Sequence, residues 1–95
     1  MKKYIGAIET LTRDIDLNNF DESVRRYAAA KVISQDLALQ MEGNEEMRYY
    51  LQKLNLSMTL LREAIFGESE GYKFAQDRLN SSRTNLAKVK GGLHE

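Results

Sequence analysis

The residues best suited to bind a metal ion lie between positions 14 and 18. Asp14, Asp16 and Asn18 alternate as the first oxygen ligands of a calcium-binding loop do. Such a loop needs a glycine at its sixth position, for the sharp turn, and a bidentate glutamate at its twelfth. Those positions hold Asn19 and Arg25. We therefore interpret the segment as a polar loop that caps the next helix, and we expect no metal there.

The single histidine, His94, follows the pair Gly91 and Gly92 near the end of the sequence. A catalytic imidazole needs a partner that fixes its tautomer and a site that excludes water, and a frayed terminus rarely provides either. Metal sites in helical bundles use Glu-x-x-His pairs, and the sequence has none. It also has no cysteine to act as a thiolate ligand or nucleophile. We predict no catalytic residue, no metal and no cofactor.

Arginines provide the main alternative, a small dimeric helical-bundle enzyme that binds an anionic metabolite. Such an enzyme needs several cationic side chains facing inward. The candidates are Arg25, Arg26, Arg48 and Arg62. Arg48 and Arg62 lie off the main apolar line of their helix, which consists of Met47, Leu51, Leu54, Met58, Leu61 and Ile65. We therefore expect a solvated position for them. The interpretation is therefore that the protein is not an enzyme.

Charge gives no sign of a nucleic-acid or membrane partner. Fourteen basic residues balance fourteen acidic ones, and the pI is about 6.6, so no strong field attracts phosphates or anionic lipids. The basic residues of the last helix scatter around its circumference, which leaves a nucleic-acid-binding regulator as a weaker alternative. The apolar run after Lys2 and Lys3 ends at Glu9, too short for a signal peptide, and no segment approaches a membrane span. We expect a cytoplasmic protein.

The apolar pattern predicts an all-α protein. A length of 95 residues suits one domain, 1–95, and the absence of proline favours uninterrupted helices. Apolar residues spaced alternately by four and three positions place one continuous line along a helix, as in coiled coils. They are Met47, Leu51, Leu54, Met58, Leu61 and Ile65. The same register extends in both directions, with Ser82 as a polar interruption downstream.

Two structures explain where the register turns polar. It does so at Gln40 with Asn44 and again at Glu68, beside Gly43 and Gly67. One explanation is a long helix in an extended coiled coil, and the other is a set of helices that fold back at the glycines. Gly43 followed by Asn44 is typical of the C-terminus of one helix and the N-cap of the next. Gly67, which precedes Glu68, Ser69 and Glu70, fits the same pattern. We favour the folded-back bundle.

The predicted architecture is a short N-terminal helix followed by three long helices in an antiparallel bundle, possibly dimeric. The expected spans are 2–15, 22–42, 45–66 and 70–90, with a frayed C-terminal tail at 91–95. The three long helices are each roughly 32 Å long at 1.5 Å per residue. Their similar lengths suit antiparallel packing.

A second apolar ridge provides the functional hypothesis. Tyr49, Leu56 and Leu60 lie roughly 160° from the main line on a helical projection. Contact with two neighbours in one bundle would give such a pattern, and so would an interface with a partner. Helix 22–42 is also apolar around most of its circumference. We predict a protein–protein interaction module, a small regulator, inhibitor or chaperone-like adaptor that forms a homodimer, with these three residues as partner-binding.

Overall fold

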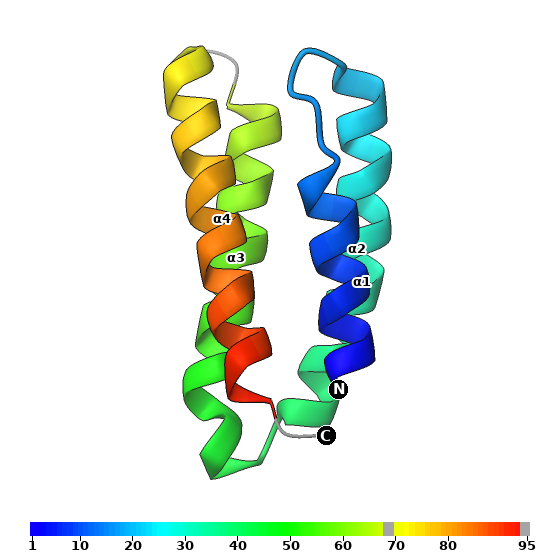
Figure 1. The fold of residues 1–95 in the computed structure, drawn as a ribbon, viewed down its shortest axis with the longest axis vertical. Coiled ribbons are helices and arrows are strands. Elements are labelled where there is room, and N and C mark those ends of the chain that lie inside the picture. The colour runs from blue at the N-terminus through cyan, green and yellow to red at the C-terminus, as the bar shows by residue number, and fades with distance from the viewer. Residues whose placement is uncertain (68–69, 94–95) are drawn as a thin grey trace.

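The structure, a computed structural model, describes residues 1–67 and 70–93. It contains the helices α1 (Lys2–Arg13), α2 (Phe20–Met41), α3 (Arg48–Phe66) and α4 (Tyr72–Gly92), with a 3-10 turn, η1 (Glu45–Met47), before α3. The four α-helices run alternately up and down, and the described residues form no strand (Figure 1). The all-α antiparallel bundle is confirmed.

Two helical hairpins make up the bundle: α1 with α2, and α3 with α4 (Figure 1). The two helices of the second hairpin pack on each other more extensively than any other pair, and α1 packs less extensively on α4. The molecule measures 38 × 19 × 18 Å. These dimensions match helices that fold back on one another, not an extended coiled coil.

The chain reverses between α2 and α3 by the local chemistry expected from the sequence. Gly43 has a φ angle of 81°, a left-handed conformation that glycine adopts without steric cost. Asn44 follows as the N-cap of η1, and its side chain accepts a hydrogen bond of 3.0 Å from the backbone N–H of Glu46. Both parts of the prediction at this turn are confirmed.

The turn between α3 and α4 contains the expected Gly67 at the end of α3 and a second glycine, Gly71, before α4. Gly67 ends α3 with a φ of −88°, whereas Gly71, with a φ of 89°, precedes the first residue of α4, Tyr72. α4 therefore starts two residues after the predicted start at 70. Glu68, where the apolar register was expected to turn polar beside Gly67, lies outside the described residues.

The segment from Asp14 to Asn19 is a loop that caps α2. The Asn19 side chain accepts a hydrogen bond from the backbone N–H of Glu22 (3.2 Å), and Ser23 Oγ donates to the carbonyl oxygens of Asp16 and Asn19. The Asp16 carboxylate accepts from the backbone N–H of Asn18. The Asn19 oxygen thus satisfies a backbone donor that the helix start would otherwise leave free, in agreement with the capping loop that we predicted.

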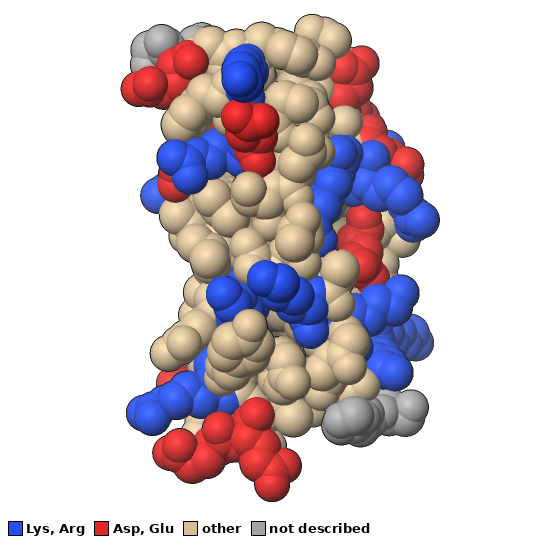
Figure 2. Space-filling model, turned by 60° about the vertical axis from the view of Figure 1, so that its left-hand side comes forward, with Lys and Arg blue, Asp and Glu red and all other residues tan. Residues whose placement is uncertain are grey.

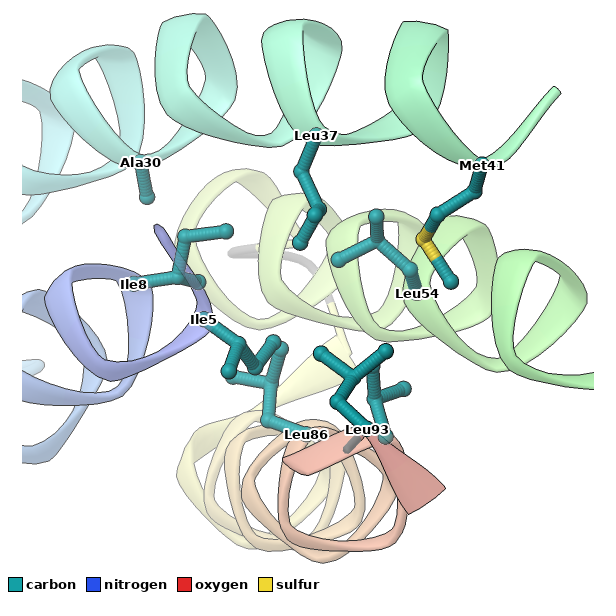
Figure 3. Close-up of a cluster of buried hydrophobic side chains, with 9 residues drawn as sticks. Ile5, Ile8, Ala30, Leu37, Met41, Leu54, Leu86 and Leu93 are labelled. Atoms are coloured by element: carbon teal, nitrogen blue, oxygen red, sulfur yellow. The ribbon is translucent and has the colours of Figure 1, made fainter. Parts of the chain in front are cut away.

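The hydrophobic core consists of two clusters, one toward each end of the bundle. Leu54 and Leu61, from the main apolar line, are completely buried, one in each cluster. Figure 3 shows side chains from all four helices converging in the first cluster, with Leu37 and Leu54 facing Ile5 and Leu86. This convergence fixes the faces that each helix turns to solvent.

The predicted frayed tail is wrong for residues 91–93. α4 continues to Gly92, and Leu93 is completely buried in the first cluster. The reason is that Val89 and Leu93 extend the apolar line of α4, and Gly92 lets the helix approach Tyr50 closely. His94 lies outside the described residues.

Candidate functional site

The three predicted partner-binding residues do not share one surface. Tyr49 and Leu56 are 52% and 43% exposed, whereas Leu60 is only 6% exposed. Ser57 and Ala64, the neighbours of Leu60 three residues before and four after it, are also buried. Ser57, Leu60 and Ala64 lie on the side of α3 that packs on α4. Of the three predicted residues, only Tyr49 and Leu56 therefore reach solvent to a large extent.

Tyr49 lies beside another aromatic ring and a cation. The ammonium of Lys53 lies 5.4 Å from the centre of its ring, and the ring of Tyr50 meets it edge to face at 5.3 Å. A cation over an aromatic face is a modest attraction at an exposed site. The Tyr49 ring therefore packs against two neighbouring side chains, and about half of its surface stays exposed for a partner to contact.

The outer face of α2 exposes more apolar surface than the α3 ridge. Val32 is 61% exposed and Leu39 is 70% exposed, and they lie seven residues apart, on one side of the helix. Ala28, four residues before Val32, is also exposed. The completely buried Ala30 and Leu37 lie about half a turn away around the helix. We call Ala28, Val32 and Leu39 the outer face of α2.

α2 is therefore not a central helix, although its sequence is apolar nearly all round. It packs mainly on α1 and α3. Sequence reasoning left two interpretations for such a helix, a central position in the bundle or a position shared between subunits. The structure removes the first and leaves an apolar face in solvent.

An aromatic cluster that sequence reasoning missed joins the start of α2 to the end of α3. The ring of Phe66 meets Phe20 and Tyr27 edge to face, with ring centres 5.8 and 5.9 Å apart. Phe20 and Phe66 are each nearly half-exposed. No periodic signal could have found the cluster, because Phe20 and Phe66 lie far apart in the sequence, at a helix start and a helix end. The cluster lies where α2 begins and α3 ends, and it leaves aromatic surface in solvent.

The four arginines considered for an anion site are not brought together. Arg26 pairs with Glu22 at 3.1 Å and approaches Asp14 at 3.9 Å, while Arg48 pairs with Glu45 at 3.8 Å on its own helix end. Arg25 and Arg62 are exposed. Arg48 and Arg62 line different grooves.

Another cationic side chain lies beside a groove of about 580 Å³ between α1 and α4. Arg83 of α4 donates from Nη2 to the carbonyl oxygens of Thr12 (3.1 Å) and Arg13 (3.0 Å), in the last turn of α1. Lys90 pairs with Glu9 across the same groove at 3.2 Å. A cation at a helix C-terminus interacts favourably with the helix dipole, so Arg83 ties α4 to the end of α1.

Charged groups are unevenly spread over the surface in Figure 2. Uncharged residues cover much of this face, basic side chains gather near mid-height, and acidic side chains mark its lower end. Within the described ranges, no three His, Cys, Asp or Glu residues are grouped so that they could hold a metal ion. No helix in that part of the chain is long and apolar enough to cross a bilayer.

Comparison with protein families, with curated proteins and with solved structures gave no match. The function must therefore be argued from the surfaces of this chain.

Proposed function

We propose that this protein is a non-enzymatic interaction protein: a small regulator, inhibitor or chaperone-like adaptor that binds a target protein through an apolar helical face. The observation that carries the proposal is the outer face of α2, where Val32 and Leu39 are 61% and 70% exposed on one line. Burying such side chains against a partner removes apolar area from water and favours association.

The spacing of this face suits helix recognition. Helices that bind in grooves use apolar anchors at positions such as i, i+4 and i+7. Ala28 and Val32 are four residues apart, Val32 and Leu39 are seven residues apart, and the intervening position of the same line holds the polar Gln35. Ala28 is small enough to let a partner backbone come close. The face therefore combines two large apolar anchors with a point of close approach.

A second copy of the chain is the partner that this face fits best. Arg25 and Asp36 are both exposed, and both lie along the same edge of the outer face, near its opposite ends. Two α2 helices packed antiparallel about a two-fold axis at Val32 would bring Arg25 of each copy within reach of Asp36 of the other. A symmetric interface must complement itself in this way. We therefore propose a homodimer through α2.

The Tyr49 and Leu56 surface of α3 is the second candidate for the target. Tyrosine is enriched among the residues that contribute most to binding at interfaces. In this arrangement α2 holds the dimer together, while α3 presents a separate surface to another protein.

The test is a double change of the outer face, Val32→Gln with Leu39→Gln. Both side chains are exposed within the chain, so the variant should keep its helical circular dichroism. Light scattering after size exclusion should show the parent as a dimer and the variant as a monomer. Ala87→Gln on the exposed side of α4 is the matched control and should leave the mass unchanged.

A parallel variant, Tyr49→Ser with Leu56→Ser, tests the α3 surface. It should remain dimeric and lose proteins that the parent captures from its source cell, identified by mass spectrometry. A monomeric parent that captures no protein would contradict the proposal. So would folded variants of both surfaces with unchanged mass and undiminished capture.

A further inference from the structure

The groove between α1 and α4 is formed by two facing lines of residues. α1 contributes residues spaced by three and four positions, and so does α4, so each helix presents one line to the groove. From α1 the line consists of Gly6, Glu9, Thr10 and Arg13, with Thr12 also in the lining, and from α4 it consists of Arg83, Leu86 and Lys90. The two helices lie antiparallel (Figure 1). The groove is thus a continuous feature of the fold, and it lies apart from the outer face of α2.

Arg83 is a half-buried cation whose charge no carboxylate neutralises among the described residues. Its Nη2 atom donates to two carbonyl oxygens of α1. Its Nε–H is buried without a hydrogen-bond partner. A buried donor without a partner is uncommon in native proteins, so this part of the guanidinium is desolvated without full compensation. A partly desolvated guanidinium also gains from a nearby anion.

The charges that line the groove are not balanced. Glu9 is the single acidic residue of the lining, and Lys90 already pairs with it. Arg13 and Arg83 therefore remain in excess, although the whole chain has a net charge of zero. Arg13 donates from Nη2 to Thr10 Oγ1 at 3.2 Å, which holds its guanidinium along the groove.

The groove also has room for a ligand. A β-carbon added at Gly6 would meet no atom within 4 Å. The buried side chain of Leu86 contributes apolar surface to the lining. A groove with two cations in excess, an apolar patch and open volume suits a small organic anion better than a bare ion.

From these observations we infer that the α1–α4 groove binds the phosphate or carboxylate group of a small molecule, held between the guanidinium groups of Arg13 and Arg83. Arg13 and Arg83 each donate to acceptors of the chain from Nη2, so Nη1 of each guanidinium remains to donate charge-assisted hydrogen bonds to the oxygens of either group. This site is independent of the protein interfaces proposed above, because its lining shares no residue with them.

The test is titration of the full chain with inorganic phosphate and, separately, with succinate, followed by NMR amide shifts. The parent should bind at least one probe saturably, with the largest shifts at Gly6, Thr10 and Arg83. The probe with the higher affinity identifies the group. Arg13→Gln should weaken binding about tenfold, because it removes one charge-assisted contact. Lys73→Gln removes an equal charge from α4 outside the lining and should not change the affinity.

A steric variant separates the groove from general charge effects. Gly6→Leu fills the groove while keeping every charge, and leucine favours a helix more than glycine does. It should abolish binding of the probe, whereas Ala7→Leu, at the exposed neighbouring position, should not. A parent that binds neither probe would overturn the inference. Affinities that fall equally in Arg13→Gln and Lys73→Gln, or that are unchanged in Gly6→Leu, would also overturn it.

Discussion

The ring of Tyr50 on α3 occupies the space that a β-carbon on Gly92 of α4 would fill. The Cζ, Cε1 and Oη atoms of the ring are the nearest atoms to that position. Tyr50 itself packs against the core cluster that contains the buried Leu93. The last turn of α4 is therefore joined to α3 by a contact that only glycine permits.

Gly92→Ala should lower the free energy of unfolding by about 1 kcal/mol or more. Overpacking a contact of this kind costs roughly 1 to 3 kcal/mol, and the higher helix propensity of alanine offsets about 0.5 to 1 kcal/mol of it. Gly91→Ala is the control, since its β-carbon would meet no atom within 4 Å, and it should be neutral or slightly stabilising. Urea unfolding followed by circular dichroism compares the two. Equal effects would show that the Tyr50 contact does not matter.

The same substitution should destabilise the protein far more at Leu60 than at Leu56. Leu60→Ala should cost roughly 2 to 5 kcal/mol, because it removes a buried side chain and leaves a cavity. Leu56→Ala should stay within about 0.5 kcal/mol of the parent, because Leu56 is 43% exposed. Both changes have equal helix propensity effects, so thermal or urea unfolding isolates the burial. Similar losses in both variants would contradict the placement of Leu60 under α4.

The N-cap of α2 should contribute measurable stability. Asn19→Ala removes the acceptor for the backbone N–H of Glu22 and should cost about 0.5 to 2 kcal/mol. Asn19→Asp should restore most of the loss, because aspartate caps equally well. Asn18→Ala, one residue earlier, leaves this bond intact and should have little effect. If Asn18→Ala proves the more damaging change, the helix start assigned here is wrong.

Local chemistry and periodicity predicted much of this fold. The spacing of Leu54 and Leu61 identified a buried line, because a repeat of three and four residues must return to one side of a helix. Gly43 with Asn44 identified a chain reversal, because both residues have a stereochemical reason to stand there. Such signals depend only on neighbours in the sequence.

The surfaces depended on packing and were harder to predict. A helical projection gives the direction of Leu60 but not the width of the α4 contact that buries it. Arg13 and Arg83 lie far apart in the sequence and share a groove only because α1 and α4 are neighbours. For the same reason Phe20 and Phe66 showed no pattern before the helices were placed. The sequence pattern thus predicted each helix better than it predicted the grooves and contacts between helices.

Ser82 provides the last test, because it interrupts the apolar register and is nevertheless completely buried. Its Oγ donates a hydrogen bond of 2.8 Å to the carbonyl oxygen of Ser57 on α3. Ser57 is also completely buried, and its own Oγ donates to the carbonyl of Lys53. Two small side chains therefore meet where α3 and α4 pack, and each hydroxyl has an acceptor.

Ser82→Leu restores the heptad pattern and should still destabilise the protein. The larger side chain overpacks the α3–α4 contact, at roughly 1 to 3 kcal/mol, and it removes a hydrogen bond worth about 1 kcal/mol. Ser82→Ala should lose only the second amount. Ser81→Leu, at the exposed neighbouring position, should be nearly neutral. In an extended coiled coil the repaired register would instead raise stability, so a gain in the unfolding free energy of Ser82→Leu would contradict the folded-back packing at this position.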